Sequence, residues 1–316
     1  IVGEHSSDVS ELPSSQKFCT EKVKKIFRLV EIMKSKPLKG FLIKRKLNKN
    51  LSVYESNSNK KNNKITEVRM ILQRQGNKKA LFKKIAKYIP EHEIYIEPFF
   101  GAGGIFFLKE RAKYNFLNDL DNEVFNLFQV IKNKPVQFKN LLQMVPKHKQ
   151  QFEYWKKNPE RIDTWQAVRF IYLSNFSFMS SGSTLKMGTS NTKFLTLSRI
   201  KATFDALMDT TFDNSPYEKF FKNIAIKQKQ GKNKIFIYCD PPYVGTSQVY
   251  NAPKWTLKDF ETLIKFLIEY GEKFMISEFN SSEVLKVAKD NNLKVIEIGE
   301  RRNLGNRRTE IIITNY

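Results

Sequence analysis

The chain is poor in residues that bind metals or form disulfide bonds. Its 316 residues include only two cysteines, Cys19 and Cys239, and three isolated histidines, His5, His92 and His148. So few cysteines exclude a disulfide framework and indicate a reducing compartment, which we expect to be the cytoplasm. Because these cysteines and histidines lack the close spacing of metal ligands, we expect no metal site.

Long hydrophobic runs are also missing. No apolar run reaches the roughly 18 residues that a membrane-spanning helix needs, so we expect no membrane partner. The first residues lack the charged and then apolar pattern of a signal peptide. The sequence has no internal repeat and no long low-complexity tract, and 41% of its residues are hydrophobic. This composition is typical of a globular protein.

Acidic residues are scarce beside basic ones. The chain has 55 lysines and arginines against 32 aspartates and glutamates, which gives a formal net charge of +23. An excess of this size favours a polyanionic partner, either nucleic acid or an acidic membrane surface. Composition alone does not separate the two, and an AT-rich genome that encodes many lysines would account for part of the excess.

The first 70 residues differ in pattern from the rest. Residues 21–34 place apolar side chains on one helical face, a basic run follows at 44–49, and residues 55–64 have the composition of a polar linker. We therefore expect residues 1–70 to form a small basic helical module and a linker.

From residue 71 onward, apolar segments of strand length alternate with segments of helical periodicity. This alternation predicts an α/β fold with a mostly parallel, doubly wound sheet. Residues 135–209 interrupt it with mixed, mostly helical sequence, so we expect one domain from residues 71–134 and 210–316 and a second from 135–209. Within 93–112 we expect a strand, a glycine turn and a helix in that order. We expect the next strand to end at Asp119 and to be followed by a helix that stops before Pro135. Further strands are expected at 234–239, 273–279, 293–299 and 310–316, and further helices at 78–90, 165–176, 197–208, 256–271 and 281–292.

A glycine-rich turn, IEPFFGAGG at 96–104, follows the first of these strands. Glycines let the backbone turn tightly and approach a ligand closely, although many strand-to-helix turns contain glycine without binding anything. Glu97 ends the strand before the turn. Asp119 ends the next strand about 20 residues later, where a Rossmann-like unit places the acid that binds a ribose. The pattern favours adenosine with an amino-acid tail over a pyrophosphate.

The sequence DPPY at 240–243 follows the apolar strand 234–239. A turn that ends a strand is its simplest explanation. The alternative is chemical: Asp240 and the carbonyl oxygen of Pro241 would accept the two hydrogens of an exocyclic amine and aim its lone pair at an electrophile. Pro241 and Pro242 would fix these acceptors in advance, and Tyr243 would stack on the base. No proton need leave before the attack, so this chemistry requires no histidine.

Taken in order, these motifs resemble the Dam-like family of DNA adenine-N6 methyltransferases. The resemblance rests on GNK at 76–78, FFGAG at 99–103, NDLD at 118–121 and DPPY at 240–243, and it covers residues 73–316. It implies a Rossmann-like class I methyltransferase sheet with an inserted, mostly helical target-recognition domain at 135–209 and a basic N-terminal extension. It also implies S-adenosylmethionine as methyl donor and double-stranded DNA as substrate, and a cognate restriction endonuclease as a partner would fit.

The resemblance also assigns roles to individual residues. The catalytic set it implies is Asp240, Pro241, Pro242 and Tyr243. The cofactor-binding set it implies is Lys78, Glu97, Pro98, Phe99, Gly101, Gly103, Asp119 and Asp240. Arg307 and Arg308, in a basic closing segment like that of the family, would contact DNA.

A polar loop inside the insertion is our candidate for reading the DNA sequence. Residues 180–193 are dense in hydrogen-bonding side chains, and Gly182 and Gly188 would allow a hairpin-like reach. An ordinary mobile surface loop is the alternative. The segment at 173–182 reads LSNFSFMSSG, which departs from the family's usual recognition signature, so no known target sequence transfers. The candidates for DNA contact are Ser181, Ser183, Lys186, Asn191 and Lys193.

Other functions fit the same motifs. The amine geometry would also serve cytosine N4, an RNA adenine or a protein glutamine, and a non-catalytic nucleic-acid-binding protein could retain the frame. The intact glycine turn, ribose acid and DPPY favour catalysis, and the large insertion favours DNA. Cys239 is interpreted as a buried strand residue, because the nucleophile of cytosine C5 methylation follows a proline and no Pro-Cys pair occurs. We predict sequence-specific methyl transfer to the N6 amine of a flipped adenine.

Overall fold

A computed structural model describes residues 70–74, 76, 78–226, 234–246, 254–302 and 307–316. These residues belong to one compact unit, 66–316. The helix expected at 21–34, the basic run at 44–49 and the linker at 55–64 lie outside the described residues.

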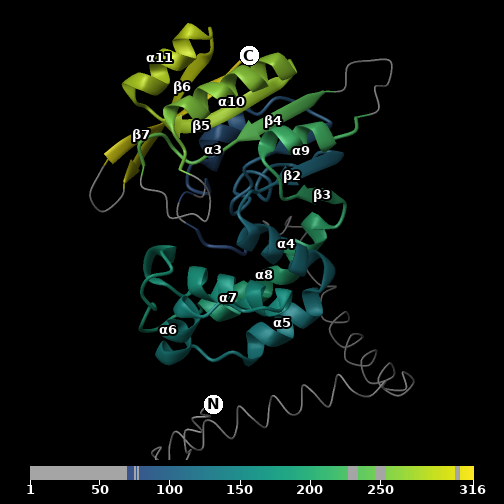
Figure 1. Ribbon diagram of the computed structural model, residues 1–316, viewed down its shortest axis with the longest axis vertical. Coiled ribbons are helices and arrows are strands. Elements are labelled where there is room, and N and C mark those ends of the chain that lie inside the picture. The colour runs from purple at the N-terminus through teal and green to yellow at the C-terminus, as the bar shows by residue number, and fades with distance from the viewer. Residues whose placement is uncertain (1–69, 75, 77, 227–233, 247–253, 303–306) are drawn as a thin grey trace, which may run out of the picture. The chain divides into compact units, whose positions relative to one another are not determined.

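The described part is built on a seven-stranded sheet of order β3-β2-β1-β4-β5-β7-β6 (Figure 1). Its strands are rich in β-branched and aromatic residues, which suit a pleated surface covered on both faces. Five strands run parallel: β1 (Ile94–Glu97), β2 (Tyr114–Asn118), β3 (Thr210–Asp213), β4 (Ile235–Cys239) and β5 (Lys273–Phe279). The hairpin of β6 (Lys294–Arg302) and β7 (Arg307–Thr314) closes one edge, with β7 antiparallel to both β5 and β6. The prediction of a mostly parallel α/β sheet is confirmed.

The strand order places a topological switch point between β1 and β4. From β1 the chain proceeds outward to β2 and β3, whereas β4 and β5 extend the sheet in the opposite direction. Open α/β sheets bind ligands outside the carboxyl ends of the strands at such a point. Glu97 ends β1 and Asp240 follows β4 directly, so the two motifs identified in the sequence meet at this edge.

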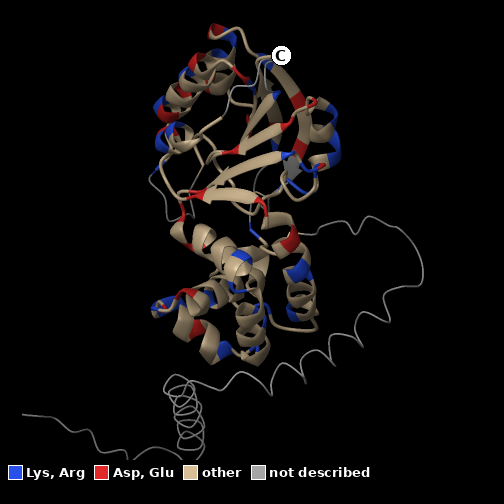
Figure 2. Cartoon of the chain, turned by 90° about the vertical axis from the view of Figure 1, so that its right-hand side faces the viewer, with Lys and Arg blue, Asp and Glu red and all other residues tan. Residues whose placement is uncertain are grey.

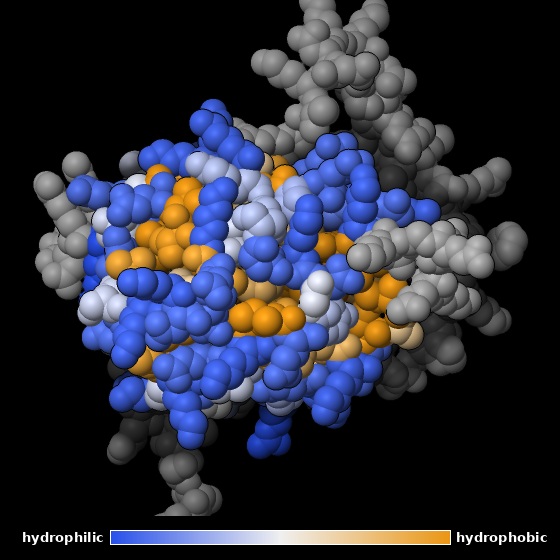
Figure 3. Space-filling view, turned by 90° about the horizontal axis from the view of Figure 1, so that it is seen from above, coloured by the Kyte–Doolittle hydropathy of each residue, from blue (hydrophilic) through white to orange (hydrophobic). Residues whose placement is uncertain are grey.

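Helices cover both faces of the sheet. On one face, α9 (Tyr217–Asn223), α10 (Leu257–Tyr270) and α11 (Ser282–Asp290) pack against alternate strand residues such as Ile96, Ile237 and Ile276. The opposite strand residues, among them Tyr95 and Tyr238, join the core to which α3 (Phe82–Ile85) and α4 (Asn122–Asn133) contribute, whereas the 3-10 turn after α3 (Ala86–Tyr88) has no buried residue. Seen from above, this end of the molecule is mostly hydrophilic, with apolar residues in separate patches (Figure 3).

Four further helices lie beyond the carboxyl edge of the sheet, in the region 135–209 (Figure 1). They are α5 (Pro135–Met144), α6 (Lys149–Lys157), α7 (Asp163–Asn175) and α8 (Thr192–Leu207). Their core residues, such as Trp155 and Tyr172, belong to the same apolar cluster as the sheet residue Tyr95. The insertion therefore packs directly on the sheet part, and the domain boundaries given above stay a prediction.

One expected element is absent. The sequence after the glycines predicted a helix, but residues 101–109 form a series of turns, with Phe107 N bonded to Gly103 O and Lys109 N to Ile105 O. Glycine, isoleucine and phenylalanine have low helix propensity. Ile105, Phe106 and Phe107 are also all buried, so packing on more than one side determines the path of this segment.

Among the described residues, no helix is long and apolar enough to cross a membrane. The same residues contain no cluster of three or more histidine, cysteine, aspartate or glutamate side chains that could hold a metal ion.

Candidate active site

A cavity of about 1070 Å³ opens at the carboxyl edge of the sheet. Its walls come from the turns after β1, β2, β3 and β4, from α7, and from the segment that precedes α3. Figure 2 shows acidic residues at several strand ends facing the inserted helices, and both basic and acidic residues on the outer helices. All the predicted catalytic residues, and all the predicted cofactor residues except Gly103, line this cavity.

Glycines shape the turn after β1 in two ways. Gly101 and Gly103 have φ of 53° and 69°, which side chains rarely adopt. A Cβ on Gly103 would lie 2.5 Å from the Phe100 ring, so this glycine serves packing instead of lining the cavity. A Cβ on Gly104 would lie 3.0 Å from the backbone nitrogen of Lys78, so Gly104 lets the segment before α3 pack closely against the turn.

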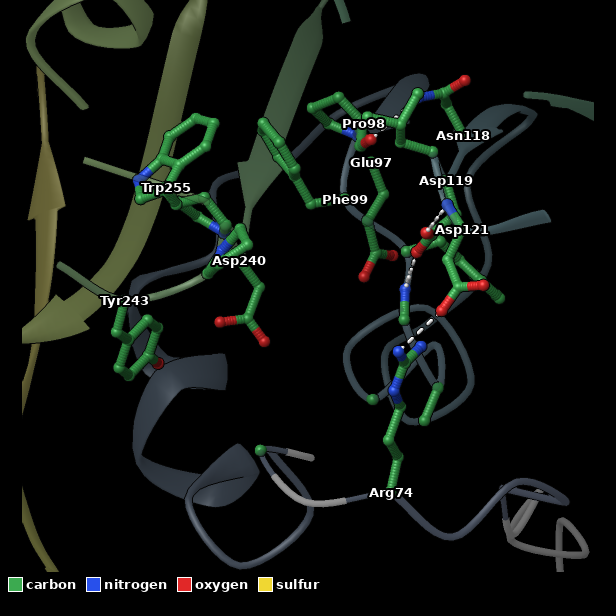
Figure 4. Close-up of a pocket in the computed structure, with 18 of the residues that line it drawn as sticks. Arg74, Glu97, Pro98, Phe99, Asn118, Asp119, Asp121, Asp240, Tyr243 and Trp255 are labelled. Carbon is green, nitrogen blue, oxygen red and sulfur yellow. Dashed lines mark hydrogen bonds and ion pairs between the residues drawn. The ribbon is translucent and has the colours of Figure 1, made fainter. Parts of the chain in front are cut away.

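Three acidic side chains line the cavity beside this turn (Figure 4). Asp119 accepts hydrogen bonds from Gly101 N at 2.6 Å and from Asp121 N at 2.8 Å. Burial raises the pKa of Asp119 to about 6, although these bonds and the charge of Arg74 lower it. Asp121 caps α4 through Glu123 N and pairs with Arg74 at 2.7 Å, as expected for a helix N-cap. The predicted ribose acid therefore also fixes the glycine turn.

Glu97 is the third of these acids. Its side chain is buried, and its Oε2 accepts the hydroxyl hydrogen of Tyr95 at 2.8 Å. Burial raises the pKa of Glu97 well above its ordinary value of 4.5. The carboxyl group points into the cavity between Asp119 and Asp240 (Figure 4).

The DPPY segment forms the opposite wall. Asp240 Oδ1 accepts a hydrogen bond from Lys78 Nζ at 2.6 Å. The Tyr243 ring is 8% exposed, contacts Phe279 edge to face at 4.5 Å, and donates its hydroxyl hydrogen to Glu310. The next residue, Val244, donates its backbone hydrogen to Glu278 Oε1 at 2.7 Å. DPPY is therefore held by side chains from β5, β7 and the segment before α3.

An aromatic wall completes the cavity. Phe99 contacts Tyr217 at 5.7 Å and Trp255 at 5.6 Å between ring centroids. The indole nitrogen of Trp255 is buried and has no hydrogen-bond partner among the described residues. Tyr217 follows β3 and Trp255 precedes α10, and neither was identified from the sequence because lone aromatic residues usually serve packing.

The donor set suits S-adenosylmethionine. Its sulfonium and ammonium groups are cationic, and the cavity offers the oxygens of the Glu97, Asp119 and Asp240 carboxyl groups. Its purine would find the aromatic wall of Phe99, Tyr217 and Trp255, with an unpaired indole N–H among the possible donors. The cavity volume is in the range of small-molecule sites, with room for more than one group.

The candidate DNA-reading loop begins with a hairpin over residues 176–186. Ser177 pairs with Leu185, Phe178 N bonds to Thr184 O at 2.8 Å, and Lys186 N bonds to Phe176 O at 2.7 Å. Ser180, Ser181 and Gly182 at its tip line the cavity. Phe178 and Met179 are 58% and 46% exposed, and Met179 has a φ of 53°. An aromatic residue at this place would usually anchor the loop in the core, but the Phe178 ring faces solvent.

The predicted DNA-contact residues fall into different settings. Lys186, Ser183 and Asn191 are exposed and Ser181 is partly buried. Lys193 Nζ donates to Gln143 O and Val145 O at the end of α5, at 2.8 and 2.6 Å. Arg308 lines the cavity, with its guanidinium 5.4 Å from the Phe279 ring centroid. The side chain of Arg307 lies outside the described residues.

Comparisons with known proteins agree with this geometry. The family model for D12 class N6 adenine-specific DNA methyltransferases matches residues 75–304. The chain is 24% identical over 268 residues to the type II methyltransferase M1.LlaDCHI of Lactococcus lactis subsp. cremoris. The aligned region covers 76% of this chain and 93% of that protein. It is 22% identical over 251 residues to the DNA adenine methylase of Vibrio cholerae, covering 72% and 88%.

Among solved structures, the N-terminal domain of human METTL16 in complex with SAH matches 75% of this chain and 68% of that one. Its TM-score is 0.33 and its identity 9%, too low to carry residues over. The family model, by contrast, spans well over half of the chain and contains both the glycine turn and DPPY. The chain belongs to the D12 class of N6 adenine-specific DNA methyltransferases, enzymes that methylate DNA adenine with S-adenosylmethionine.

Proposed function

We propose that this chain methylates the N6 amine of an adenine flipped out of double-stranded DNA, at a specific sequence, with Asp240 and Tyr243 as its catalytic residues. One observation carries the residue assignment: DPPY lines the same cavity as the glycine turn and Asp119. Target base and methyl donor would therefore meet at the switch point between β1 and β4.

S-adenosylmethionine, when bound, supplies an electrophilic methyl group on a positively charged sulfur. Asp240 and the carbonyl oxygen of Pro241 would accept the two amine hydrogens of the base and direct the nitrogen lone pair into the cavity. The acceptors are preorganised because two prolines fix their backbone and Lys78 holds the carboxylate. Tyr243 would form one wall for the flipped base.

The hairpin 176–186 supports a DNA-binding role for the inserted helices. It exposes Phe178 and Met179 to solvent directly before Ser180, Ser181 and Gly182, which line the cavity. Proteins that bend DNA insert such apolar side chains between base steps. Lys186, Ser183, Ser181 and Asn191 remain our candidates for base contacts, whereas the two backbone bonds of Lys193 favour a structural role for it. Arg308 and Arg307 would contact the phosphates next to the flipped base.

Two finer points belong to this proposal. A cognate restriction endonuclease would fit a chain similar to a type II methyltransferase. Action on DNA also favours the cytoplasm as its location in a cell without a nucleus. Cytosine N4 remains the nearest alternative target, because the same acceptors would serve that amine.

Substitution of Asp240 tests the proposal. Asp240→Ala should lower turnover by at least about 100-fold while cofactor and DNA affinity stay within about tenfold, because the carboxylate acts mainly in the transition state. Transfer of a labelled methyl group to unmethylated genomic DNA, followed by nucleoside analysis, measures the rate and identifies the base. Asp209→Ala, an exposed aspartate after α8, is the matched control. Near-normal turnover by Asp240→Ala, or methylcytosine as the product, would contradict the proposal.

A further inference from the structure

Glu310 lies beneath the catalytic wall although it is 70 residues beyond Asp240 in the sequence. It belongs to β7, where its backbone is paired with Phe279 of β5, and its side chain is fully buried. Its Oε1 atom accepts the hydroxyl hydrogen of Tyr243 and lies 3.1 Å from Lys78 Nζ. One carboxylate oxygen therefore contacts two residues of the site.

Lys78 connects Glu310 to Asp240. Its ammonium donates hydrogen bonds to Asp240 Oδ1 at 2.6 Å and to Gly76 O at 3.3 Å, and it forms an ion pair with Glu310 Oε1 at 3.1 Å. It also lies 4.8 Å from the Tyr243 ring centroid. The sequence analysis assigned Lys78 to the cofactor, but a contact with the cofactor's tail would require Lys78 to give up one of these bonds.

This arrangement is costly as a structural device. Lys78 is 2% exposed and Glu310 is 0% exposed, and burying charges carries a desolvation penalty that pairing only partly offsets. An apolar pair of similar size would stabilise the fold at least as well. The charged pair instead fixes the orientation of the catalytic side chains. The hydrogen bond to Glu310 fixes the plane of the Tyr243 ring, and the hydrogen bond from Lys78 fixes the rotamer of Asp240.

Protonation favours the same arrangement. Burial, followed by the negative charges of Asp240 and Glu310, raises the pKa of Tyr243 well above its ordinary value of 10. The Tyr243 hydroxyl therefore keeps its hydrogen across the working range of pH and continues to donate to Glu310.

We infer that Glu310 is a positioning residue for methyl transfer, which fixes Tyr243 through its hydroxyl and Asp240 through Lys78. This inference rests on the proposed function, because it assumes that Tyr243 and Asp240 meet the target base. Glu310 itself touches neither base nor methyl donor; it acts through the two side chains that do.

The test compares Glu310→Gln, Tyr243→Phe and the double variant in the full-length chain. Each single variant should lower the single-turnover rate by about 10- to 100-fold, the usual cost of removing a supporting residue, and leave cofactor Kd within about threefold. Because Tyr243→Phe removes the donor of the Tyr243–Glu310 hydrogen bond and Glu310→Gln weakens its acceptor, the double variant should be at most about threefold slower than the slower single variant. Glu300→Gln makes the same change at an exposed position of the β6–β7 hairpin and should keep the wild-type rate.

Three results would overturn the inference. The first is a single-turnover rate of Glu310→Gln within about threefold of the wild type. The second is a double variant whose rate loss equals the product of the two single losses. The third is a variant that weakens cofactor binding but keeps the wild-type single-turnover rate. If Glu310→Gln does not fold, Tyr243→Phe decides alone, because it removes only the hydroxyl: an unchanged rate overturns the inference, and a loss at constant cofactor Kd supports it. Failure of the proposed function would appear separately, as a wild-type protein that methylates no adenine.

Discussion

At the scale of single residues, Asp119 fixes the glycine turn and is also our candidate for binding the ribose. Both of its oxygens accept backbone hydrogens, one of them from the glycine turn. A ribose would bind to a carboxylate whose position is already fixed, which limits the entropy lost on binding. If Asp119 binds the ribose, cofactor affinity should depend on the charge of this side chain.

Asp119→Asn should therefore weaken cofactor binding by roughly 10- to 100-fold, the cost of losing hydrogen bonds to a charged group. Wild-type affinity should also fall as the pH drops through about 6, because burial raises the pKa of Asp119 to about 6 and the protonated form is a poorer acceptor. Calorimetry between pH 5 and 8 measures both effects. If Asp119→Asn binds the cofactor with the affinity and the pH profile of the wild type, Asp119 does not belong to the cofactor site.

Glu278 should leave a signature in the pH dependence of stability. Burial raises its pKa to about 7, although the backbone amides of Val244 and Phe279 lower it. The ordinary pKa is 4.5, so between pH 4.5 and 7 the folded form keeps a proton that the unfolded form has released. The contribution of Glu278 to the free energy of unfolding is fully present below pH 4.5 and is lost as the pH rises through 7.

Removal of this group should flatten that dependence. From pH 5 to pH 8, the free energy of unfolding of the wild type should fall by on the order of 1–3 kcal/mol relative to Glu278→Gln. Urea unfolding at several pH values measures the difference. Glu269→Gln, at an exposed position of α10, should parallel the wild type at every pH. Parallel curves for Glu278→Gln would show that Glu278 titrates alike in the folded and unfolded chain.

At the scale of secondary-structure elements, the hairpin 176–186 brings exposed apolar side chains next to the cavity. Phe178 and Met179 face solvent, as other residues of the insertion such as Phe194 do, but they directly precede Ser180, Ser181 and Gly182, which line the cavity. Met179 and Ser180 have φ of 53° and 55°, a conformation that costs residues other than glycine free energy. Such strain persists only when the surrounding bonds hold it, as the backbone pairing of this hairpin does.

Phe178→Ala should weaken DNA binding and slow base flipping, with a loss of about 1–3 kcal/mol in DNA affinity, the range measured for aromatic contacts with bases. Lys186→Ala should instead relax the preference at one position of the recognised sequence. Binding to duplexes with 2-aminopurine at the target, together with sequencing of methylated genomic DNA, separates the two effects. Tyr114→Ala is a suitable control, because Tyr114 is 48% exposed at the amino end of β2, the edge opposite the cavity. If neither variant differs from this control, the hairpin does not contact DNA.

At the scale of the whole molecule, the dominant property is the net charge of +23. Acidic residues lie at several strand ends, and the outer helices carry basic and acidic residues together (Figure 2). A positive charge excess of this size suits binding to the phosphate backbone of DNA.

Duplex binding should therefore depend steeply on salt. The logarithm of the association constant should fall linearly with the logarithm of the salt concentration, with a slope on the order of −5, because bound lysines and arginines release counterions. Fluorescence anisotropy with one duplex between 50 and 300 mM salt measures it. A chain that starts at residue 66 would show how much of the slope comes from the N-terminal module. A slope shallower than about −2 would be too small for a protein that binds the DNA backbone over a broad basic surface.

The sequence by itself determined the fold class, the family and most of the cavity wall. Alternating strands and helices define a parallel sheet, and parallel strands bring their carboxyl ends to one edge. Glu97, Asp119 and Asp240 each end or follow a strand, so their approach follows from short-range pattern and topology alone. The order of the glycine turn and DPPY added the family.

Only the tertiary structure decided what supports that wall. Glu278 reads in the sequence as an ordinary polar position of a strand, and Glu310 matches the family's closing segment without a stated role, yet both side chains are buried under DPPY. Their place depends on β7 entering between β5 and β6 and on Lys78 folding back against the glycine turn. Packing likewise prevented the helix expected after the glycines. Periodicity reports which face of an element is buried, but the partner of a buried charge is set by contacts between segments far apart in the chain.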